Sequence, residues 1–522
     1  MSSPRIETVW TPVEYVCAAK NEYENPYIAV ETSATVSHED GETYELPGFW
    51  DGNATWRFRF APPRVGEWTV SITSNMDDAG LTHEASFVAT DYEGPNAIRR
   101  HGFLSTSDRS LIHDDGTEFF WLADTAWSAG AKATSAEWQQ FVSARREQGF
   151  NVVQINSLPQ WDASRPWDRF PFGHEWDLDV PDPTYFQELD TLVSMAYDYG
   201  LVPALVALWF NYAPGTWPDW DNETDRHPFS TEQAERFGRY LAARYGAYGT
   251  VWLVSGDTNY DEDDPAALDV YTAAAEAIAD SVTHPLQTTH MVGGQATPEN
   301  VLERDWVDFH LYQSSHVTDL ERPINLAIEC RDRDGQPVIN GEPPYERHGY
   351  FDEPGKRISR ETVRKAGWLS VFAGGTAGLT YGGHGIWQWH RRGDRFGGAD
   401  RIGMPDPWEE TLGYQGARDY GDLRSFIEEY DRNALKPKQD VIVDAPPLTR
   451  GLIDETSGDV LVYAATAHEL MFDRGQLNVI SAARWIHPGE WTSVPATFDD
   501  DGETLTMSPP PWSGDGILVL SE

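Results

Sequence analysis

The middle of this chain repeats one kind of junction three times, and this repeat constrains the fold more than any other feature. In each junction a helical pattern ends at a glycine and an apolar run follows shortly after it. The three junctions are REQGFNVVQINS (146–157), AYDYGLVPALVALW (196–209) and RYGAYGTVWLVSGD (244–257). A helix that leads into a buried strand, several times over, predicts βα units around a parallel sheet.

Eight strand-like runs can be distinguished, at 119–127, 151–157, 201–209, 250–257, 285–292, 307–313, 337–342 and 377–383. Helical patterns follow them near 135–148, 184–199, 231–245, 264–282, 297–303, 322–331, 358–373 and 417–431. Two of these helices begin with capping boxes, Thr134–Glu137 and Ser230–Gln233. Eight βα units predict a (β/α)8 TIM barrel. A doubly wound open sheet is the alternative, but no glycine-rich phosphate loop follows any strand to support it.

The two ends of the chain have a different pattern. Stretches such as YIAVETSATVSH (27–38) and GDVLVYAATA (458–467) alternate as strands do, and turns with Gly or Pro separate them without intervening helices. We therefore expect three domains: an N-terminal β-sandwich over 1–95, a catalytic barrel over 96–437, and a C-terminal β-sandwich over 438–522.

Composition excludes some partners. The formal net charge is −45, which disfavours nucleic acid and anionic membranes as partners and indicates adaptation to high salt, where charges are screened. No apolar run is long enough to cross a bilayer. Cys17 and Cys330 lie far apart, so neither a disulfide nor a cysteine metal site is expected. The start, MSSPRIETVW, does not read as a signal peptide, so the expected location is cytoplasmic, or secreted if a leader has been removed.

In a TIM barrel the active site forms where the strands end. Polar and aromatic side chains at the predicted strand ends are therefore the candidate site residues: Asp124, Trp127, Asn156, Trp209, Asn211, Asp257, Asn259, His290, His310, Tyr312, Glu342, His384, Trp387 and Trp389. Trp161 follows the second strand. Amides and carboxylates hydrogen-bond hydroxyl groups, and aromatic rings pack on the C–H faces of sugars. Two carboxylates in such a site supply the acid/base and the nucleophile of glycoside hydrolysis.

Asp257 and Glu342 are the predicted catalytic pair. Asp257 stands several residues before the next expected helix, and Glu342 precedes Pro343 and Pro344, so helix capping explains neither acid well. Asp124, in contrast, has an equally good interpretation as a helix cap. His290, His310 and His384 could be metal ligands, but no HxH or HExxH spacing supports a metal site. No G-x-S-x-G motif indicates a serine nucleophile.

Several stretches are similar to the apiosidase-like glycoside hydrolases: DGTEFFWLADTAW with GFNVVQIN, GTVWLVSGDTNY, INGEPPYE and GLTYGGHGIWQW. The resemblance implies a TIM barrel behind an N-terminal β-sandwich, with a C-terminal β-sandwich after it. It also implies an acid/base at the end of strand four, matched by Asp257, and a nucleophile at the end of strand seven, matched by Glu342. Many related barrels carry Asn-Glu at strand four, whereas Gly256-Asp257 here supplies an acid that is one carbon shorter.

The sequence thus predicts a retaining glycoside hydrolase that uses no cofactor and no metal and whose partner is a carbohydrate substrate. Three alternatives stay open: a non-catalytic carbohydrate-binding protein on the same barrel, a metal-dependent hydrolase, and a structural or adhesive role of the flanking domains. The sugar, its linkage and the oligomeric state are not indicated by the sequence.

Overall fold

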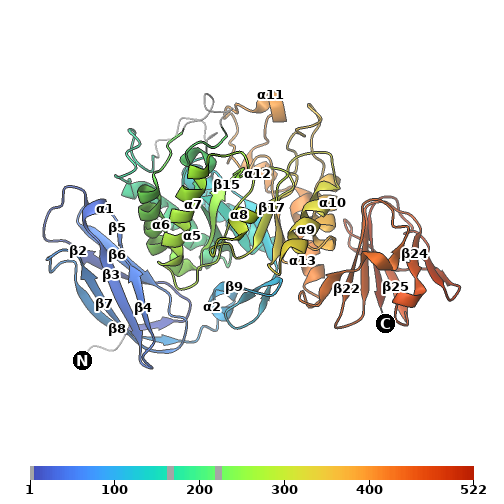
Figure 1. Ribbon diagram of the computed structural model, residues 1–522, viewed down its shortest axis with the longest axis horizontal. Coiled ribbons are helices and arrows are strands. Elements are labelled where there is room, and N and C mark those ends of the chain that lie inside the picture. The colour runs from blue at the N-terminus through green and yellow to red at the C-terminus, as the bar shows by residue number, and fades with distance from the viewer. Residues whose placement is uncertain (1–4, 161–169, 218–225, 522) are drawn as a thin grey trace.

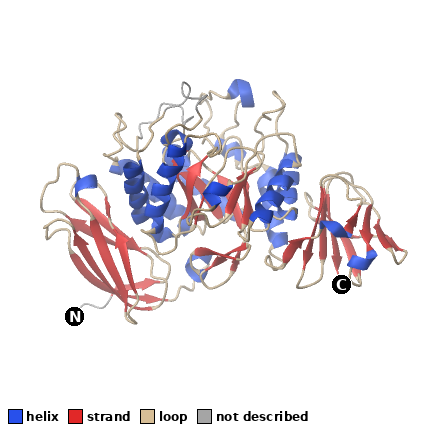
Figure 2. Ribbon diagram, in the orientation of Figure 1, coloured by secondary structure: helices blue, strands red, loops and turns tan. Residues whose placement is uncertain are grey.

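A central barrel lies between two regions made of β-sheets. The computed structural model describes residues 5–160, 170–217 and 226–521. Figure 1 shows the N-terminal sheets in blue at one end, the barrel in the middle, and the C-terminal sheets in red at the other end. Figure 2 shows that the two ends consist almost wholly of strands and loops, whereas helices cover the strands of the middle part.

The barrel is one eight-stranded parallel sheet. Its strands are β12 (Trp121–Thr125), β13 (Val152–Asn156), β14 (Val202–Trp209), β15 (Val251–Gly256), β16 (Gln287–Thr288), β17 (His310–Gln313), β18 (Val338–Glu342) and β19 (Gly378–Tyr381). Their spatial order, β16-β15-β14-β13-β12-β19-β18-β17, pairs the first strand with the eighth. At the remaining gap the N–H of Asp308 donates to the carbonyl of Gln287 over 2.9 Å. This nearly closed ring is the TIM barrel that the sequence predicts, not an open doubly wound sheet.

Helices follow the barrel strands close to where they are expected. They are α3 (Ala129–Lys132), α4 (Ser135–Glu147), α5 (Pro183–Asp198), α6 (Thr231–Tyr245), α7 (Pro265–Ala279), α8 (Glu299–Leu302), α9 (Arg322–Arg333), α10 (Arg360–Phe372), α11 (Ala399–Ile402), α12 (Trp408–Thr411) and α13 (Gln415–Ile427), with short 3-10 turns η1 (Phe210–Tyr212) and η3 (Gly246–Tyr248). Both predicted capping boxes are formed, at the starts of α4 and α6.

Two antiparallel sheets and two short helices make up most of the N-terminal region. One sheet has the order β1 (Arg5–Thr8), β8 (His83–Thr90), β7 (Gly66–Ser74), β3 (Thr32–His38), β4 (Thr43–Pro47), with β1 parallel to β8, and the other has the order β2 (Val13–Ala18), β6 (Thr55–Phe60), β5 (Phe49–Trp50). The helices are α1 (Pro26–Ala29) and α2 (Ala97–His101). The two sheets share a hydrophobic core in which the rings of Phe60 and Trp68 lie 5.2 Å apart. A further small sheet, β9 (Leu104–Ser107), β10 (Ser110–His113) and β11 (Glu118–Phe119), lies near α2 below the barrel in Figure 1.

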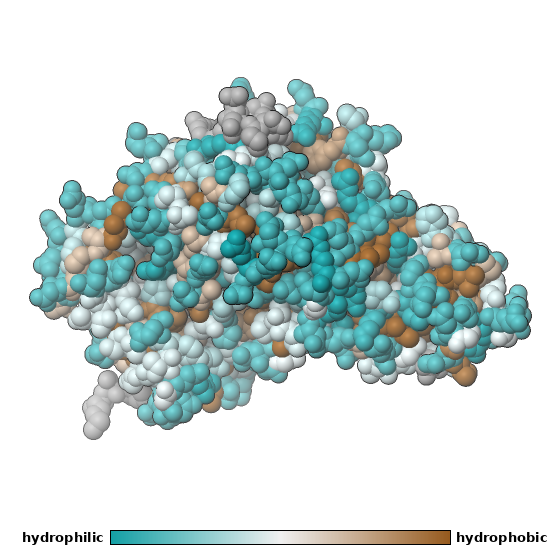
Figure 3. Space-filling model, viewed as in Figure 1, coloured by the Kyte–Doolittle hydropathy of each residue, from teal (hydrophilic) through white to brown (hydrophobic). Residues whose placement is uncertain are grey.

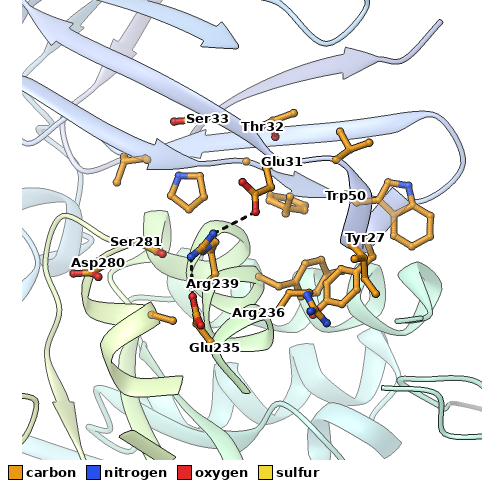
Figure 4. A pocket seen from close by; sticks show the side chains of 18 of the residues that line it. Tyr27, Glu31, Thr32, Ser33, Trp50, Glu235, Arg236, Arg239, Asp280 and Ser281 are labelled. Carbon is orange, nitrogen blue, oxygen red and sulfur yellow. Dashed lines mark hydrogen bonds and ion pairs between the residues drawn. The ribbon is translucent and has the colours of Figure 1, made fainter. Parts of the chain in front are cut away.

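Buried charges attach the N-terminal sheets to the barrel. Arg244 of α6 is fully buried and forms ion pairs with Asp51, which follows β5, and with Asp190 of α5, at 2.7 and 2.6 Å. Beside this contact a groove of about 600 Å³ separates β3, β4 and β5 from α6 and α7 (Figure 4). An ion pair between Arg239 and Glu31, 3.7 Å long, crosses the groove.

The C-terminal region also holds two antiparallel sheets. One has the order β20 (Leu435–Pro437), β22 (Thr449–Asp454), β23 (Val460–Ala464), β29 (Gly516–Ser521), β25 (Ala482–His487), β26 (Thr492–Pro495) and the other β21 (Ile442–Val443), β24 (Leu470–Asp473), β28 (Thr504–Met507), β27 (Phe498–Asp500), with 3-10 turns η4 (Gln439–Val441) and η5 (Arg474–Gln476). Arg364 of α10 pairs with Asp515 over 2.7 Å, and Trp368 stacks on Tyr463. These contacts fasten this region to the barrel.

The visible surface is mostly hydrophilic. The face in Figure 3 has apolar areas scattered between hydrophilic ones. Cys17 and Cys330 are buried free thiols in different regions of the chain. Within the described residues, no helix is both long and apolar enough to span a membrane.

Candidate active site

Glu342 is the last residue of β18 and is surrounded by hydrogen-bonding side chains. Its Oε1 lies 3.1 Å from Nε2 of His316 and its Oε2 lies 3.3 Å from Nε2 of His290. The hydroxyl group of Tyr345 also hydrogen-bonds with it. Burial opposes ionisation, but the hydrogen bonds from the two histidines outweigh it and lower the pKa of Glu342 to about 2. Glu342 is therefore a carboxylate throughout the physiological pH range.

The proton position on His316 follows from its neighbours. The backbone N–H of Tyr345 donates to Nδ1 of His316 over 3.2 Å, so Nδ1 is an acceptor. A neutral imidazole carries its single proton on the other nitrogen, and Nε2 therefore donates to Glu342. This bond fixes one lone pair of Oε1 and leaves the orientation of the carboxylate well defined.

Asp257 follows directly after β15 and approaches the same region from the opposite side. Its Oδ1 accepts a hydrogen bond of 2.9 Å from Nε2 of Gln313 and lies 3.9 Å from Nε2 of His290. About a quarter of the side chain (26%) is exposed, so a ligand can reach it. Asp257 also has a left-handed backbone, with φ 51°, which is uncommon for a residue other than glycine.

His290, which follows β16, lies between the two acids. It is fully buried, and its ring packs against Trp127 (5.1 Å) and Trp209 (5.8 Å). A Cβ atom on Gly256 would come within 2.0 Å of the Trp209 ring, so glycine is needed just before Asp257. Trp127, Trp209 and His290 thus form a contiguous aromatic wall beside both carboxylates.

Amide groups complete this end of the barrel. Asn156 and Gln154 of β13 are buried, and neither side-chain amide has a hydrogen-bond partner among the described residues. Asn211 is buried in η1, directly after β14. Asn259 accepts a hydrogen bond of 3.2 Å from Nε2 of Gln295 and donates to Glu262 over 2.9 Å. Buried amides with unused donors and acceptors are suited to hydroxyl groups of a ligand.

Asp124 is not part of this group, and its predicted role in substrate binding is wrong. Nε of Arg145, in α4, donates to its Oδ2 over 2.5 Å, and both side chains are about 1% exposed. Arg145 also lies over the rings of Phe150 and Tyr381. Asp124 is therefore an ion-pair partner on the helix side of β12, not a ligand-binding group inside the barrel.

His310 and Tyr312 also point away from the two acids. Nε2 of His310 lies 3.0 Å from Asp334, in the loop that precedes β18. The hydroxyl group of Tyr312 donates to the carbonyl of Pro323 in α9 over 3.1 Å. Both side chains are fully buried and face outside the barrel, which corrects their predicted role as sugar ligands.

The three candidates after β19 have different positions. Trp389 is fully buried and packs against Trp408 of α12 at 5.0 Å and Phe141 of α4 at 5.4 Å, so its ring belongs to the helix layer and not to the group around the two acids. His384 accepts from Nε1 of Trp387 and bonds the carbonyl of Gly403, so both of its ring nitrogens have protein partners. Burial lowers the pKa of His384 to about 3. Trp387 is 8% exposed, and its role in lining the site stays a prediction.

One side chain of the site has no sequence signal that marks it. His316 lies in the loop after β17, where no motif distinguishes it, and it contacts Glu342 only through the fold. Gln313 stands at the end of the predicted strand 307–313, and a β-bulge between Tyr312 and Gln313 aligns it with Glu342. Trp161 lies outside the described residues. In the described part of the chain, no group of three His, Cys, Asp or Glu side chains could hold a metal ion.

A family model for the apiosidase-like catalytic domain matches residues 105–433. The chain belongs to the apiosidase-like family. A second model, for a domain of unknown function (DUF5060), matches residues 7–75 of this apiosidase-like protein. No curated protein sequence matches the chain.

Several solved structures share the fold of this apiosidase-like protein. One is a glycoside hydrolase with 20% identity and a TM-score of 0.69, over 81% of this chain and 97% of that one. A glycoside hydrolase family 5 protein from Bacteroides vulgatus has the same identity and TM-score, over 81% and 93%. A candidate glycoside hydrolase from the same species has 17% identity and a TM-score of 0.75 over the full length of both chains. At such identities the likeness concerns the fold.

Proposed function

We propose that this protein is a retaining glycoside hydrolase in which Asp257 is the acid/base and Glu342 the nucleophile. The main support is that both carboxylates face one buried imidazole, that of His290. The two distances through its Nε2 limit the separation of Oδ1 of Asp257 and Oε2 of Glu342 to about 7 Å. That limit on one pair of oxygens accommodates the spacing of retaining enzymes, about 5–5.5 Å.

In the first step Glu342 attacks the anomeric carbon. It is ionised, since its pKa is about 2, and His316 and Tyr345 hold its carboxylate in one orientation. The bond from the anomeric carbon to the leaving oxygen breaks, and Asp257 gives its proton to that oxygen. The result is a glycosyl ester on Glu342 and an ionised Asp257.

In the second step a water molecule replaces the leaving group. Ionised Asp257 takes a proton from this water, whose oxygen attacks the anomeric carbon. The ester bond breaks and Glu342 leaves as a carboxylate, so both acids return to their starting states. The amide of Gln313 donates to Oδ1 and so orients the carboxyl group of Asp257.

The substrate that fits this site is an oligosaccharide or polysaccharide. In this proposal Asn156, Asn211 and Asn259 bind hydroxyl groups, and Trp127 with Trp209, whose rings lie 5.3 Å apart, forms the aromatic wall beside a sugar ring. Apiosides are the first substrates to test, because the matching family model is described as apiosidase-like. A non-catalytic carbohydrate-binding protein would need no second carboxylate beside Glu342, so the presence of Asp257 favours the enzyme.

The flanking regions fit a supporting role. We assign residues 1–95 and 438–522 to β-sandwich domains around a barrel domain at 96–437, because each end has two sheets and the C-terminal sheets have a core of their own. The buried pairs Arg244–Asp51 and Arg364–Asp515 hold these domains against the barrel. The net charge of −45 is consistent with function at high salt.

The test is turnover of a panel of nitrophenyl glycosides and plant-wall oligosaccharides, apiosides included, in high-salt buffer. Wild type is compared with Asp257→Asn and Glu342→Gln. The proposal predicts that wild type cleaves a member of the panel and that each variant loses at least about 99% of that activity. Undiminished cleavage by the variants contradicts the catalytic pair, and sugar binding without turnover by wild type favours the binding protein.

A further inference from the structure

Asp257 and Trp217 share an unusual backbone conformation and are bonded to each other. Their φ angles are 51° and 45°, in the left-handed region. Nε1 of Trp217 donates to the backbone carbonyl of Asp257 over 2.6 Å. Residues other than glycine occupy this region only where their surroundings stabilise it. Contacts around these two residues must therefore hold Asp257 in place.

A buried acid that the proposed mechanism does not use makes those contacts. Oδ1 of Asp263 accepts from the backbone N–H of Trp217 over 3.2 Å, and Oδ2 accepts from the backbone N–H of Asn259 over 3.0 Å. One carboxylate thus joins the loop after β14 to the loop after β15, on either side of Asp257. Asp263 is only 9% exposed.

Helix capping does not account for Asp263. The next residue, Asp264, is the N-cap of α7, and its Oδ1 accepts from the N–H of Ala266 over 2.9 Å. The bond from Trp217 reaches Asp263 across 46 residues of sequence, so it is not part of a local turn. The carboxylate of Asp263 is therefore available to hydrogen-bond the loops that hold Asp257.

The charge of Asp263 is sensitive to pH. Burial raises its pKa to about 6, against the hydrogen bonds from Trp217 and Asn259 and the attraction of Arg226, while Glu262 raises it further. Tyr260 and Tyr271, which also interact electrostatically with Asp263, have raised pKa values themselves and stay neutral. A protonated carboxyl group accepts weaker hydrogen bonds than a carboxylate.

We propose that Asp263 is a positioning residue that holds Asp257 through Trp217 and Asn259, and that loss of its charge in mildly acidic solution loosens this hold. The consequence for catalysis depends on the proposed role of Asp257 as acid/base. The hydrogen bonds from Trp217 and Asn259 to Asp263 are part of the fold, and their strength can be measured without a substrate.

The first experiment is hydrogen–deuterium exchange of peptides that contain Trp217 and Asn259, one pH unit above and one below about 6. After correction for intrinsic rates, wild type should exchange these amides about tenfold faster at the lower pH, because hydrogen bonds to a charged acceptor are lost. Asp263→Asn should exchange them rapidly at both values. The exposed Asp261→Asn removes the same charge nearby and should behave as wild type.

Wild type alone can overturn the proposal, whatever the stability of the variant: equal corrected exchange at the two pH values contradicts it. The second experiment is the pH profile of kcat/KM on any glycoside that the enzyme cleaves. For wild type and Asp261→Asn, kcat/KM should fall below about pH 6. For Asp263→Asn, kcat/KM should show no such fall and should be lower than that of wild type at every pH.

The two proposals fail separately. If the exchange responds to pH as expected but no glycoside is turned over, the hold on Asp257 stands and the enzymatic function fails. The opposite outcome is that glycosides are cleaved while hydrogen–deuterium exchange near Trp217 and Asn259 changes neither with pH nor in Asp263→Asn. In that case the enzymatic function stands and the proposed role of Asp263 is wrong.

Discussion

Nε2 of His316 donates a hydrogen bond to Oε1 of Glu342 over 3.1 Å, and the donor direction is fixed by a backbone N–H on the other ring nitrogen. Together with His290, this bond keeps Glu342 ionised although the side chain is buried. A nucleophile must be unprotonated to attack, so the hydrogen bond from the loop after β17 favours the state that the proposed role of Glu342 requires.

Ionised Glu342 should also stabilise the fold in a pH-dependent way. Its folded pKa, about 2, lies below the ordinary value of 4.5, so its contribution is complete above about pH 4.5 and is lost as the pH falls toward 2. The difference in unfolding free energy between wild type and Glu342→Gln should therefore be constant near neutral pH and should change below pH 4.5, by on the order of 3 kcal/mol in all. Chemical denaturation across this range measures it. The exposed Glu303→Gln is the control, and a constant difference down to pH 3 would contradict the prediction.

Removing the charge of Asp124 should damage stability and spare catalysis. Asp124→Asn leaves the guanidinium of Arg145 buried without a charged partner, so the unfolding free energy should fall by about 3–5 kcal/mol. KM should stay within about twofold of wild type, because Asp124 faces α4. Urea unfolding and steady-state kinetics check both parts. A tenfold rise of KM at unchanged stability would restore Asp124 to the binding site.

How far the sequence could predict these positions depends on the barrel itself. The sequence predicts all eight barrel strands, because long apolar runs between helical patterns are a strong signal. It does not predict which way each side chain points, because barrel strands are buried on both faces and lack alternation. The sequence consequently predicts Asp124 and Tyr312 as site residues, although their side chains contact helices. Asp257 and Glu342 each come right at a strand end, which is why the sequence predicts them as the catalytic pair, and that role stays a prediction.

Residues in loops were harder to predict. His316 contacts Glu342 only through tertiary structure, and Asp263 resembles the helix cap beside it. Trp389 has a left-handed backbone, with φ 53°, which turns its ring against Trp408 instead of into the barrel. No local pattern of residues indicates such a turn.

The two tryptophans Trp209 and Trp389 should respond differently to the same substitution. Trp209→Phe disturbs the wall beside His290 and should lower kcat/KM by about 100-fold, since small displacements in an active site are costly. Trp389→Phe loses packing against Trp408 and should lower the unfolding free energy by about 1–3 kcal/mol at nearly unchanged kcat/KM. Kinetics and thermal unfolding of the two variants separate the effects. The reverse pattern would mean that Trp389 faces the substrate.

Gly256→Ala should disturb the site without adding any charge or polar group. The new Cβ atom would lie 2.0 Å from the Trp209 ring, so the ring or the strand must move. We expect a loss of about 1–3 kcal/mol in unfolding free energy and at least a tenfold fall in kcat/KM. Gly335→Ala is the matched control, because nothing lies within 4 Å of its Cβ position. Wild-type activity of Gly256→Ala would show that Trp209 is not held as described.

The most direct test of the central claim is to trap the covalent intermediate. The enzyme is incubated with activated 2-deoxy-2-fluoro glycosides of the sugars that it cleaves, and labelled peptides are identified by mass spectrometry. If Glu342 is the nucleophile, one glycosyl group per protein should be attached to Glu342, and Glu342→Gln should carry no label. A label on another residue, or none while the parent glycoside is turned over, would contradict Glu342 as the nucleophile of a retaining enzyme.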